Sequence, residues 1–193
     1  YDAHPHWSAD GKWITFHSNR PVQRLLASGQ QEATSLSLIL DESESVDDLA
    51  FLRLAGGVGE FVDNLREGTR ISVTKFDHKV TYALDFTEDR AAVKDAVGAR
   101  RHFCATAIYD ALYESMTRLS AQPGKRLAVL VSDGWDNSSV RTQEEIVAYA
   151  RSHQIALFAV FISNPNYPAN PQSLRTMAES TGGPLIEVAD FGG

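Results

Sequence analysis

Residues 36–45, LSLILDESES, place a short apolar strand directly before a cluster of oxygen-bearing side chains. The run Leu36–Leu40 has the length and aliphatic content of a buried strand, and Asp41, Ser43 and Ser45 follow it at every second position. Such side chains at a strand end can hold a metal ion, hold a phosphate, supply a nucleophile or cap a helix. The surrounding sequence ranks these four roles.

Four further runs rich in β-branched and aliphatic residues follow this strand: RISVTKF, KVTYALDF, RLAVLVS and IALFAVFI. Polar segments of helical length separate most of them. This alternation predicts an α/β fold that is Rossmann-like and doubly wound, with a mostly parallel sheet and helices on both faces. Only Asp77–Lys79 separates the first two of these runs, and a parallel crossover needs at least about a dozen residues. The pair therefore predicts a hairpin that adds one antiparallel edge strand.

Several helix boundaries are also marked in the sequence. Apolar residues recur every three or four positions over residues 106–119, which predicts an amphipathic helix with Thr106 in its first turn. Thr142 and Glu145 have the spacing of a capping box, and Gly182–Gly183 closes the last predicted helix.

The first 34 residues differ in character from the rest of the chain. Asp10–Gly11 lies between two short runs, the second of which alternates, and this pattern predicts a β-hairpin within residues 1–21. Residues 22–34 then form a connector, and residues 35–193 form the main α/β domain.

Composition excludes several classes of protein. The chain has 193 residues, of which 43% are hydrophobic and 22% charged, as in a soluble globular protein with one main domain. The formal charge is −7 and no basic run interleaves with aromatic residues, so we expect no nucleic-acid partner. No apolar stretch is long enough to span a membrane, and the single cysteine, Cys104, leaves no disulfide framework.

A second group of polar residues follows another strand. Ser132-Asp133-Gly134 comes directly after RLAVLV, as Asp41 comes after its own strand. In open α/β sheets, ligands bind at the carboxyl edge where the strand order reverses, because the loops diverge there. We therefore expect the side chains of Asp41 and Asp133 to converge at one edge of the sheet.

Together, Asp41-x-Ser43-x-Ser45, Thr106 and Asp133 resemble the metal-ion-dependent adhesion site of von Willebrand factor type A domains. The resemblance covers about residues 35–190 and includes the stretches ATAIYDAL, VSDGWDNSS and MAESTGG. It implies that the two serines and Thr106 contact Mg²⁺ directly, while the two aspartates act largely through bound water. It also implies that an Asp or Glu carboxylate of a partner protein completes the coordination shell.

The chemistry of these residues agrees with that implication. Mg²⁺ prefers six hard oxygen ligands and gives up water reluctantly, so hydroxyls and water-bridged carboxylates suit it, and Mn²⁺ should substitute. Around the ion, Glu44, Trp135 and Asp136 are candidates for a rim that contacts the partner. The family often has glycine at the position of Glu44, and we interpret Glu42 and Glu44 as solvated charges beside the turn.

The N-terminal segment PHWSADGKWITFHSNR resembles one repeat of a TolB-type β-propeller, although a chance tryptophan-rich hairpin is the alternative. If the resemblance holds, it implies a bacterial extracytoplasmic protein, either periplasmic or secreted. Type A domains usually add a last helix after the strand near PLIEVADF. We therefore expect a trimmed chain that lacks this helix and begins at Tyr1 without its leader.

Two other functions compete with cation-dependent binding. One is a metal-dependent hydrolase in which Ser43 or Ser45 is the nucleophile and His102 or His78 is the base. The other is a metal-free interaction scaffold, in which the same polar residues only cap a helix. The sequence has no Gly-x-Ser-x-Gly elbow and no glycine-rich phosphate loop with lysine, so we predict a binding domain and no enzyme. The partner and the oligomeric state are not encoded in any motif.

Overall fold

The structure is a computed structural model, and it describes residues 6–7, 14–15, 33–46, 48–98, 105–162 and 166–187, without the side chains of 6–7, 14–15 and 48–55. It divides into two units, Tyr1–Glu32 and Ala33–Gly193. In the first unit, β1 (His6–Trp7) pairs with β2 (Ile14–Thr15) in an antiparallel manner. The rest of the TolB-like segment, the connector up to residue 32 and residues 188–193 lie outside the described residues.

The second unit contains a six-stranded sheet in the order β5-β4-β3-β6-β7-β8. Its strands are β3 (Thr34–Asp41), β4 (Arg70–Phe76), β5 (Val80–Thr87), β6 (Lys125–Ser132), β7 (Ile155–Phe161) and β8 (Leu185–Glu187). All neighbouring strands are parallel except β4 and β5, which form the hairpin that places β5 at the edge. The predicted mixed sheet with one antiparallel edge strand is confirmed.

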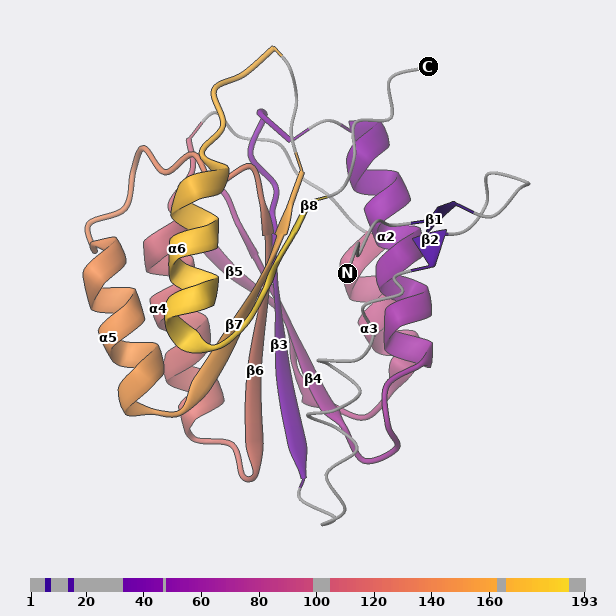
Figure 1. Cartoon of the computed structure of the whole chain (residues 1–193). Coiled ribbons are helices and arrows are strands. Elements are labelled where there is room, and N and C mark those ends of the chain that lie inside the picture. The colour runs from indigo at the N-terminus through magenta and orange to yellow at the C-terminus, as the bar shows by residue number, and fades with distance from the viewer. Residues whose placement is uncertain are drawn as a thin grey trace. The chain divides into compact units, whose positions relative to one another are not determined.

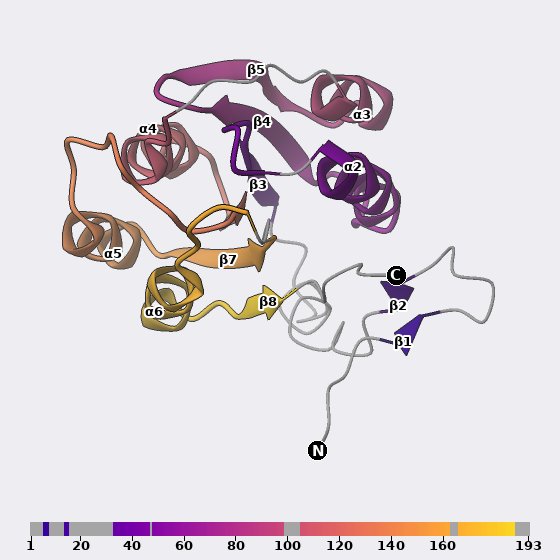
Figure 2. The ribbon, with the colours of Figure 1, turned by 90° about the horizontal axis from the view of Figure 1, so that it is seen from above.

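Helices cover both faces of this sheet (Figures 1 and 2). On one face lie α2 (Asp48–Asp63) and α3 (Arg90–Gly98), and on the other lie α4 (Ile108–Ser120), α5 (Gln143–Ser152) and α6 (Pro171–Thr181). The α/β fold class predicted from the alternating runs is confirmed.

The central position of β3 explains its composition. Every residue of β3 is buried, since β4 and β6 flank it and helices cover both faces. Ile39 belongs to the core that α4, α5 and α6 form with the sheet. Side chains alternate along a strand, so Asp41 is on the same face as Ile39, and Leu40 is on the face of α2 and α3. The strand thus carries its carboxylate to the edge from inside the core.

The helix boundaries agree with the capping signals except at α4. Thr142 and Glu145 form the predicted capping box of α5, and Gly182 ends α6 in the left-handed conformation at φ 87°. The helix α4 begins at Ile108, so placing Thr106 in its first turn was wrong. The backbone of Thr106 bonds to Asn137 and Ser138 instead, and these bonds hold it outside the helix.

Two glycines provide a test of this packing. A Cβ at Gly183 would lie 1.9 Å from the backbone oxygen of Leu157, whereas a Cβ at Gly57 in α2 would meet nothing within 4 Å. We expect Gly183→Ala to lower the free energy of unfolding by about 1–3 kcal/mol, because a strand backbone must move. The matched control Gly57→Ala should raise it by about 0.5–1 kcal/mol. Urea unfolding of both variants checks this, and equal midpoints would contradict the packing.

Candidate functional site

Asp41 is the centre of the candidate site at the carboxyl edge of the sheet. It is 1% exposed and lies at the end of β3. The hydroxyl of Ser132, at the end of β6, donates to Asp41 Oδ2 at 2.6 Å, and the N–H of Ser43 donates to Asp41 Oδ1 at 2.9 Å. One carboxylate therefore fixes both the neighbouring strand end and the turn that carries the serines.

The other predicted residues of this edge lie around Asp41. The hydroxyls of Ser43 and Ser45 are 3.0 Å apart. Asp133 is 1% exposed, and its Oδ1 accepts the N–H of Trp135 at 2.8 Å. Its second oxygen, Oδ2, is buried and accepts no hydrogen bond of normal geometry. Sequence reasoning missed Ser132 as the side chain that orients Asp41.

Burial of two carboxylates at one place changes their acidity. Burial raises the pKa of Asp41 to about 7, even though hydrogen bonds from Ser132 and Ser43 lower it, and the charge of Asp133 adds to the rise. Burial also raises the pKa of Asp133, against the lowering effects of the Ser45 hydroxyl and the Trp135 amide. Burial therefore disfavours the ionised form of both carboxyl groups in the metal-free protein.

Thr106 is held in place by the loop that follows Asp133. Its N–H donates to Asn137 Oδ1 at 2.9 Å, and its carbonyl oxygen accepts the N–H groups of Asn137 and Ser138. Thr106 is 3% exposed. The loop after β6 thus fixes the position of Thr106. The sequence gives no sign of this role of Asn137, because 31 positions separate the two residues.

The three predicted rim residues differ in their surroundings. Glu44 is exposed, and Trp135 is 42% exposed although it follows a buried aspartate. Asp136 is half-buried, and its Oδ2 accepts the N–H of Ile108 at 2.7 Å and the Ser139 hydroxyl at 2.6 Å. Asp136 therefore caps α4 from a different segment, while Glu44 and Trp135 remain accessible to a partner.

The interpretation of Glu42 as a solvated charge was wrong. Glu42 is 6% exposed, and its Oε1 lies 3.1 Å from the Nζ of Lys75, which is 5% exposed. Residue 75 pairs with Leu40 in the sheet, so a lysine on β4 meets the residue that follows the end of β3. No local pattern in the sequence predicts this pairing, because 33 positions separate the two residues.

The donor set at this edge fits a hard divalent cation. It offers two buried carboxylates, one of them with an unpaired oxygen, and a pair of serine hydroxyls. Within the part of the chain that the structure describes, no three His, Cys, Asp or Glu side chains gather as a metal-binding cluster. Mg²⁺ accepts hydroxyl and water ligands and does not require such a cluster.

His78 and His102 are the candidate bases of the hydrolase alternative. His78 Nδ1 lies 2.9 Å from Asp77 Oδ1 in the turn between β4 and β5. His102 and Cys104 lie outside the described residues. Of the two candidate bases, the described residues therefore place only His78, which lies beside Asp77 in that turn.

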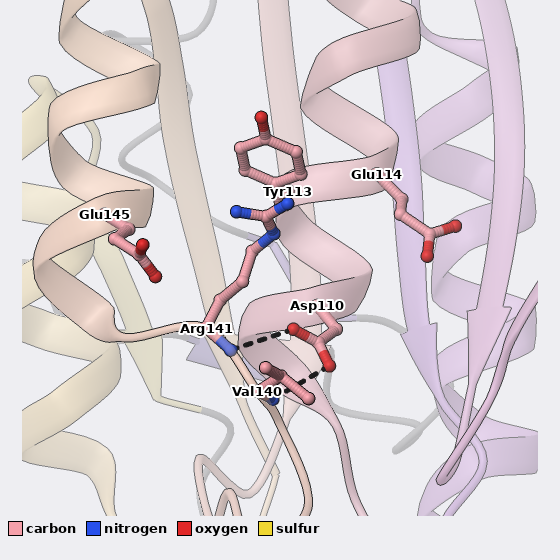
Figure 3. Close-up of a pocket in the computed structure, with 6 residues that line it drawn as sticks. All are labelled: Asp110, Tyr113, Glu114, Val140, Arg141 and Glu145. Atoms are coloured by element: carbon pink, nitrogen blue, oxygen red, sulfur yellow. Dashed lines mark hydrogen bonds between the residues drawn. The ribbon is translucent and has the colours of Figure 1, made fainter.

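Away from the Asp41 edge, a hollow of about 400 Å³ lies between α4 and the start of α5 (Figure 3). Arg141 lies over the ring of Tyr113, with its guanidinium carbon 3.3 Å from the ring centre. Asp110 accepts the N–H groups of Val140 and Arg141 at 3.0 and 3.1 Å. Because its polar groups already contact one another, we place the functional site at the Asp41 edge.

Comparisons with known proteins agree with this fold. A family model described as von Willebrand factor type A domain matches residues 36–193. No curated protein matches the sequence. No helix among the described residues is long and apolar enough to cross a membrane.

Similar solved structures share the fold at low sequence identity. A von Willebrand factor type A protein from Catenulispora acidiphila has a TM-score of 0.70 at 21% identity, over 82% of this chain and 39% of that one. Proximal thread matrix protein 1 from the mussel byssus has a TM-score of 0.69 at 17% identity, over 82% and 42%. The hypothetical protein BatB from Bacteroides thetaiotaomicron has a TM-score of 0.66 at 16% identity, over 82% and 91%.

The raised pKa of Asp41 predicts how the stability of the metal-free protein depends on pH. The folded protein keeps the Asp41 proton up to about pH 7, whereas the unfolded chain releases it near the ordinary aspartate pKa of 3.8. The stabilising contribution is complete below that lower value and is lost as the pH rises through 7. Between pH 5 and pH 8 the free energy of unfolding should fall by about 2–3 kcal/mol on this account.

Urea unfolding of the wild type and of Asp41→Asn in the presence of a chelator measures this effect. The asparagine variant cannot ionise at this position, so its stability relative to the wild type should rise with pH across that range. A constant difference between the two proteins from pH 5 to pH 8 would contradict the raised pKa.

Proposed function

Because the chain belongs to the von Willebrand factor type A family, whose members generally serve adhesion or protein binding, we propose that it binds a partner protein through Mg²⁺. The cation would be held by Asp41, Ser43, Ser45, Thr106 and Asp133. Mn²⁺ would substitute for Mg²⁺. The partner would supply an Asp or Glu carboxylate, and no reaction is part of this function.

The single observation that carries the proposal is the unpaired Oδ2 of Asp133. A buried carboxylate oxygen that accepts no hydrogen bond of normal geometry is unfavourable, even though the Ser45 hydroxyl lowers the pKa of the same carboxyl group. This oxygen lies in the same site as the buried Asp41. A divalent cation, with its bound waters, would satisfy this oxygen and offset the repulsion between the two carboxylates. The same features have no evident use in a metal-free scaffold.

Each residue has a distinct part in this proposal. Ser43, Ser45 and Thr106 would supply neutral hydroxyl oxygens, and Asp41 and Asp133 would accept hydrogen bonds from water on the ion. None of the ligands that would contact the ion directly is anionic, so an anionic group from outside remains a favourable direct ligand. The exposed Glu44 and Trp135 would then contact the partner around that carboxylate.

Several other features stay predictions. The extracytoplasmic location rests on the TolB-like segment, most of which lies outside the described residues. The specific partner and the oligomeric state are open to direct measurement, by capture with and without chelator and by sedimentation.

Asp41→Ala and Thr106→Ala test the metal site directly. Asp41 orders the serine turn and Thr106 adds an oxygen from another loop, so each change should weaken Mg²⁺ binding by roughly ten- to a hundredfold. Calorimetric titration with MgCl₂ measures the affinity, and a thermal melt without metal shows whether each variant is folded.

Asp95→Ala is the matched control, since it removes an exposed carboxylate from α3 and should leave the affinity unchanged. If the wild type binds neither Mg²⁺ nor Mn²⁺, or if Asp41→Ala binds as tightly as the wild type, the proposal is wrong. In that case the metal-free scaffold becomes the better interpretation.

Because the described residues of the site offer hydroxyls and carboxylates and no histidine, we predict that the protein does not turn over esters. Purified protein with Mg²⁺ should hydrolyse p-nitrophenyl phosphate and p-nitrophenyl acetate no faster than Mg²⁺ with Asp41→Ala protein. Hydrolysis that is lost in Ser43→Ala or Ser45→Ala would support the hydrolase alternative instead.

A further inference from the structure

The buried ion pair of Glu42 and Lys75 lies immediately beside the candidate cation site. The ammonium nitrogen and the carboxylate oxygen are 3.1 Å apart, and the side chains are only 8% and 6% exposed. Glu42 stands between Asp41 and Ser43 in the sequence, so a third carboxylate belongs to the same turn. Neither the fold nor the proposed ligand set requires a buried charge pair here.

The alternation of side chains shows where this pair points. Phe76 and Ile39 belong to the core on the side of α4, α5 and α6. Lys75 precedes Phe76 and is therefore on the opposite face, toward α2 and α3. Asp41 shares the face of Ile39, whereas Glu42 contacts Lys75. Glu42 thus lies on the other face of the sheet from Asp41, with the Lys75 ammonium group as its positive partner there.

One carboxylate oxygen of Glu42 has room for a further hydrogen-bond or metal partner. Its Oε1 accepts no hydrogen bond of normal geometry, although the ammonium group is close enough for a strong electrostatic attraction. The backbone N–H of Glu42 bonds to the carbonyl oxygen of Phe76 at 2.8 Å, which fixes the backbone of this position to the end of β4. Without Lys75, this buried carboxylate would have no positive partner at 3.1 Å.

A carboxylate on the serine turn would compete with one from a partner. A group tethered next to the metal ligands acts at a high effective concentration, so it would occupy a coordination position before an external carboxylate could. Any residue that keeps Glu42 away from the ion therefore protects the position that a partner needs.

We propose that Lys75 is a positioning residue that determines what the cation can bind, because it holds Glu42 away and keeps one coordination position open to an external carboxylate. This inference rests on the proposed function, since it needs a bound cation. It assigns a role to a residue that contacts neither the ion nor the partner.

Four proteins test the inference: wild type, Lys75→Met, Glu42→Gln and the double variant with both changes. The probe is Mn²⁺ alone, followed by Mn²⁺ with acetate as the simplest carboxylate. Titration calorimetry gives the affinity, and water-proton relaxation reports how much water remains on the bound ion. A thermal melt without metal checks that each protein is folded.

In Lys75→Met, Glu42 should become a ligand. Mn²⁺ should bind about tenfold more tightly, since an anionic ligand is added, and relaxation should fall because water is displaced. Acetate should reduce relaxation in the wild type and have little effect in Lys75→Met. In Glu42→Gln the lone ammonium should weaken binding, while the double variant should resemble the wild type. A purely structural role would instead weaken binding in both single variants.

Lys75→Gln is the second variant if Lys75→Met does not fold, because its amide can still donate to Glu42 without a charge. It should show the same changes with a smaller amplitude. If the wild type binds Mn²⁺ but neither lysine variant changes affinity or relaxation, this inference is wrong and the proposed function stands. If the wild type binds no Mn²⁺, both are wrong.

Discussion

The hydrogen bond from Ser132 to Asp41 is the contact on which the arrangement of the site depends. It joins the ends of β3 and β6 at 2.6 Å, inside the protein and at the centre of the sheet. Because the same carboxylate also accepts the N–H of Ser43, the loops after both strands share one fixed point. The remaining polar groups of the edge are arranged around a side chain that cannot move without disturbing the core.

The burial of carboxyl groups at this point is electrostatically unfavourable. Asp41 and Asp133 are buried together, and burial raises the pKa of both. In a protein without a ligand for this site, such an arrangement would be a liability, because apolar residues of similar size would be more stable. The loop after Asp133 nevertheless contributes further order, since Asn137 fixes the backbone of Thr106 and Asp136 caps α4. Local instability within a rigid frame is typical of functional sites.

The sequence predicted the sheet well because strand composition and loop length are local properties. The three residues between Phe76 and Val80 leave no choice but a hairpin, and the carboxyl ends of parallel strands must meet at one edge. The cap of α4 could not be predicted in this way, since Asp136 reaches it from a loop 28 positions away. The interpretation of Glu42 as a solvated charge failed for the same reason. Its burial depends on Lys75, which comes close only through the register of β3 and β4.

The balance of charge at the edge connects these observations. Asp41 and Asp133 together carry two negative charges when ionised, which a divalent cation neutralises, and Lys75 neutralises Glu42. An incoming carboxylate would then meet a site without net charge in its buried part, while the exposed Glu44 is screened by water. If Glu42 were unpaired, the same carboxylate would meet an excess negative charge in a poorly screened place. A buried lysine on the far face of the sheet thus makes a strongly acidic turn, DESES, compatible with binding another acid.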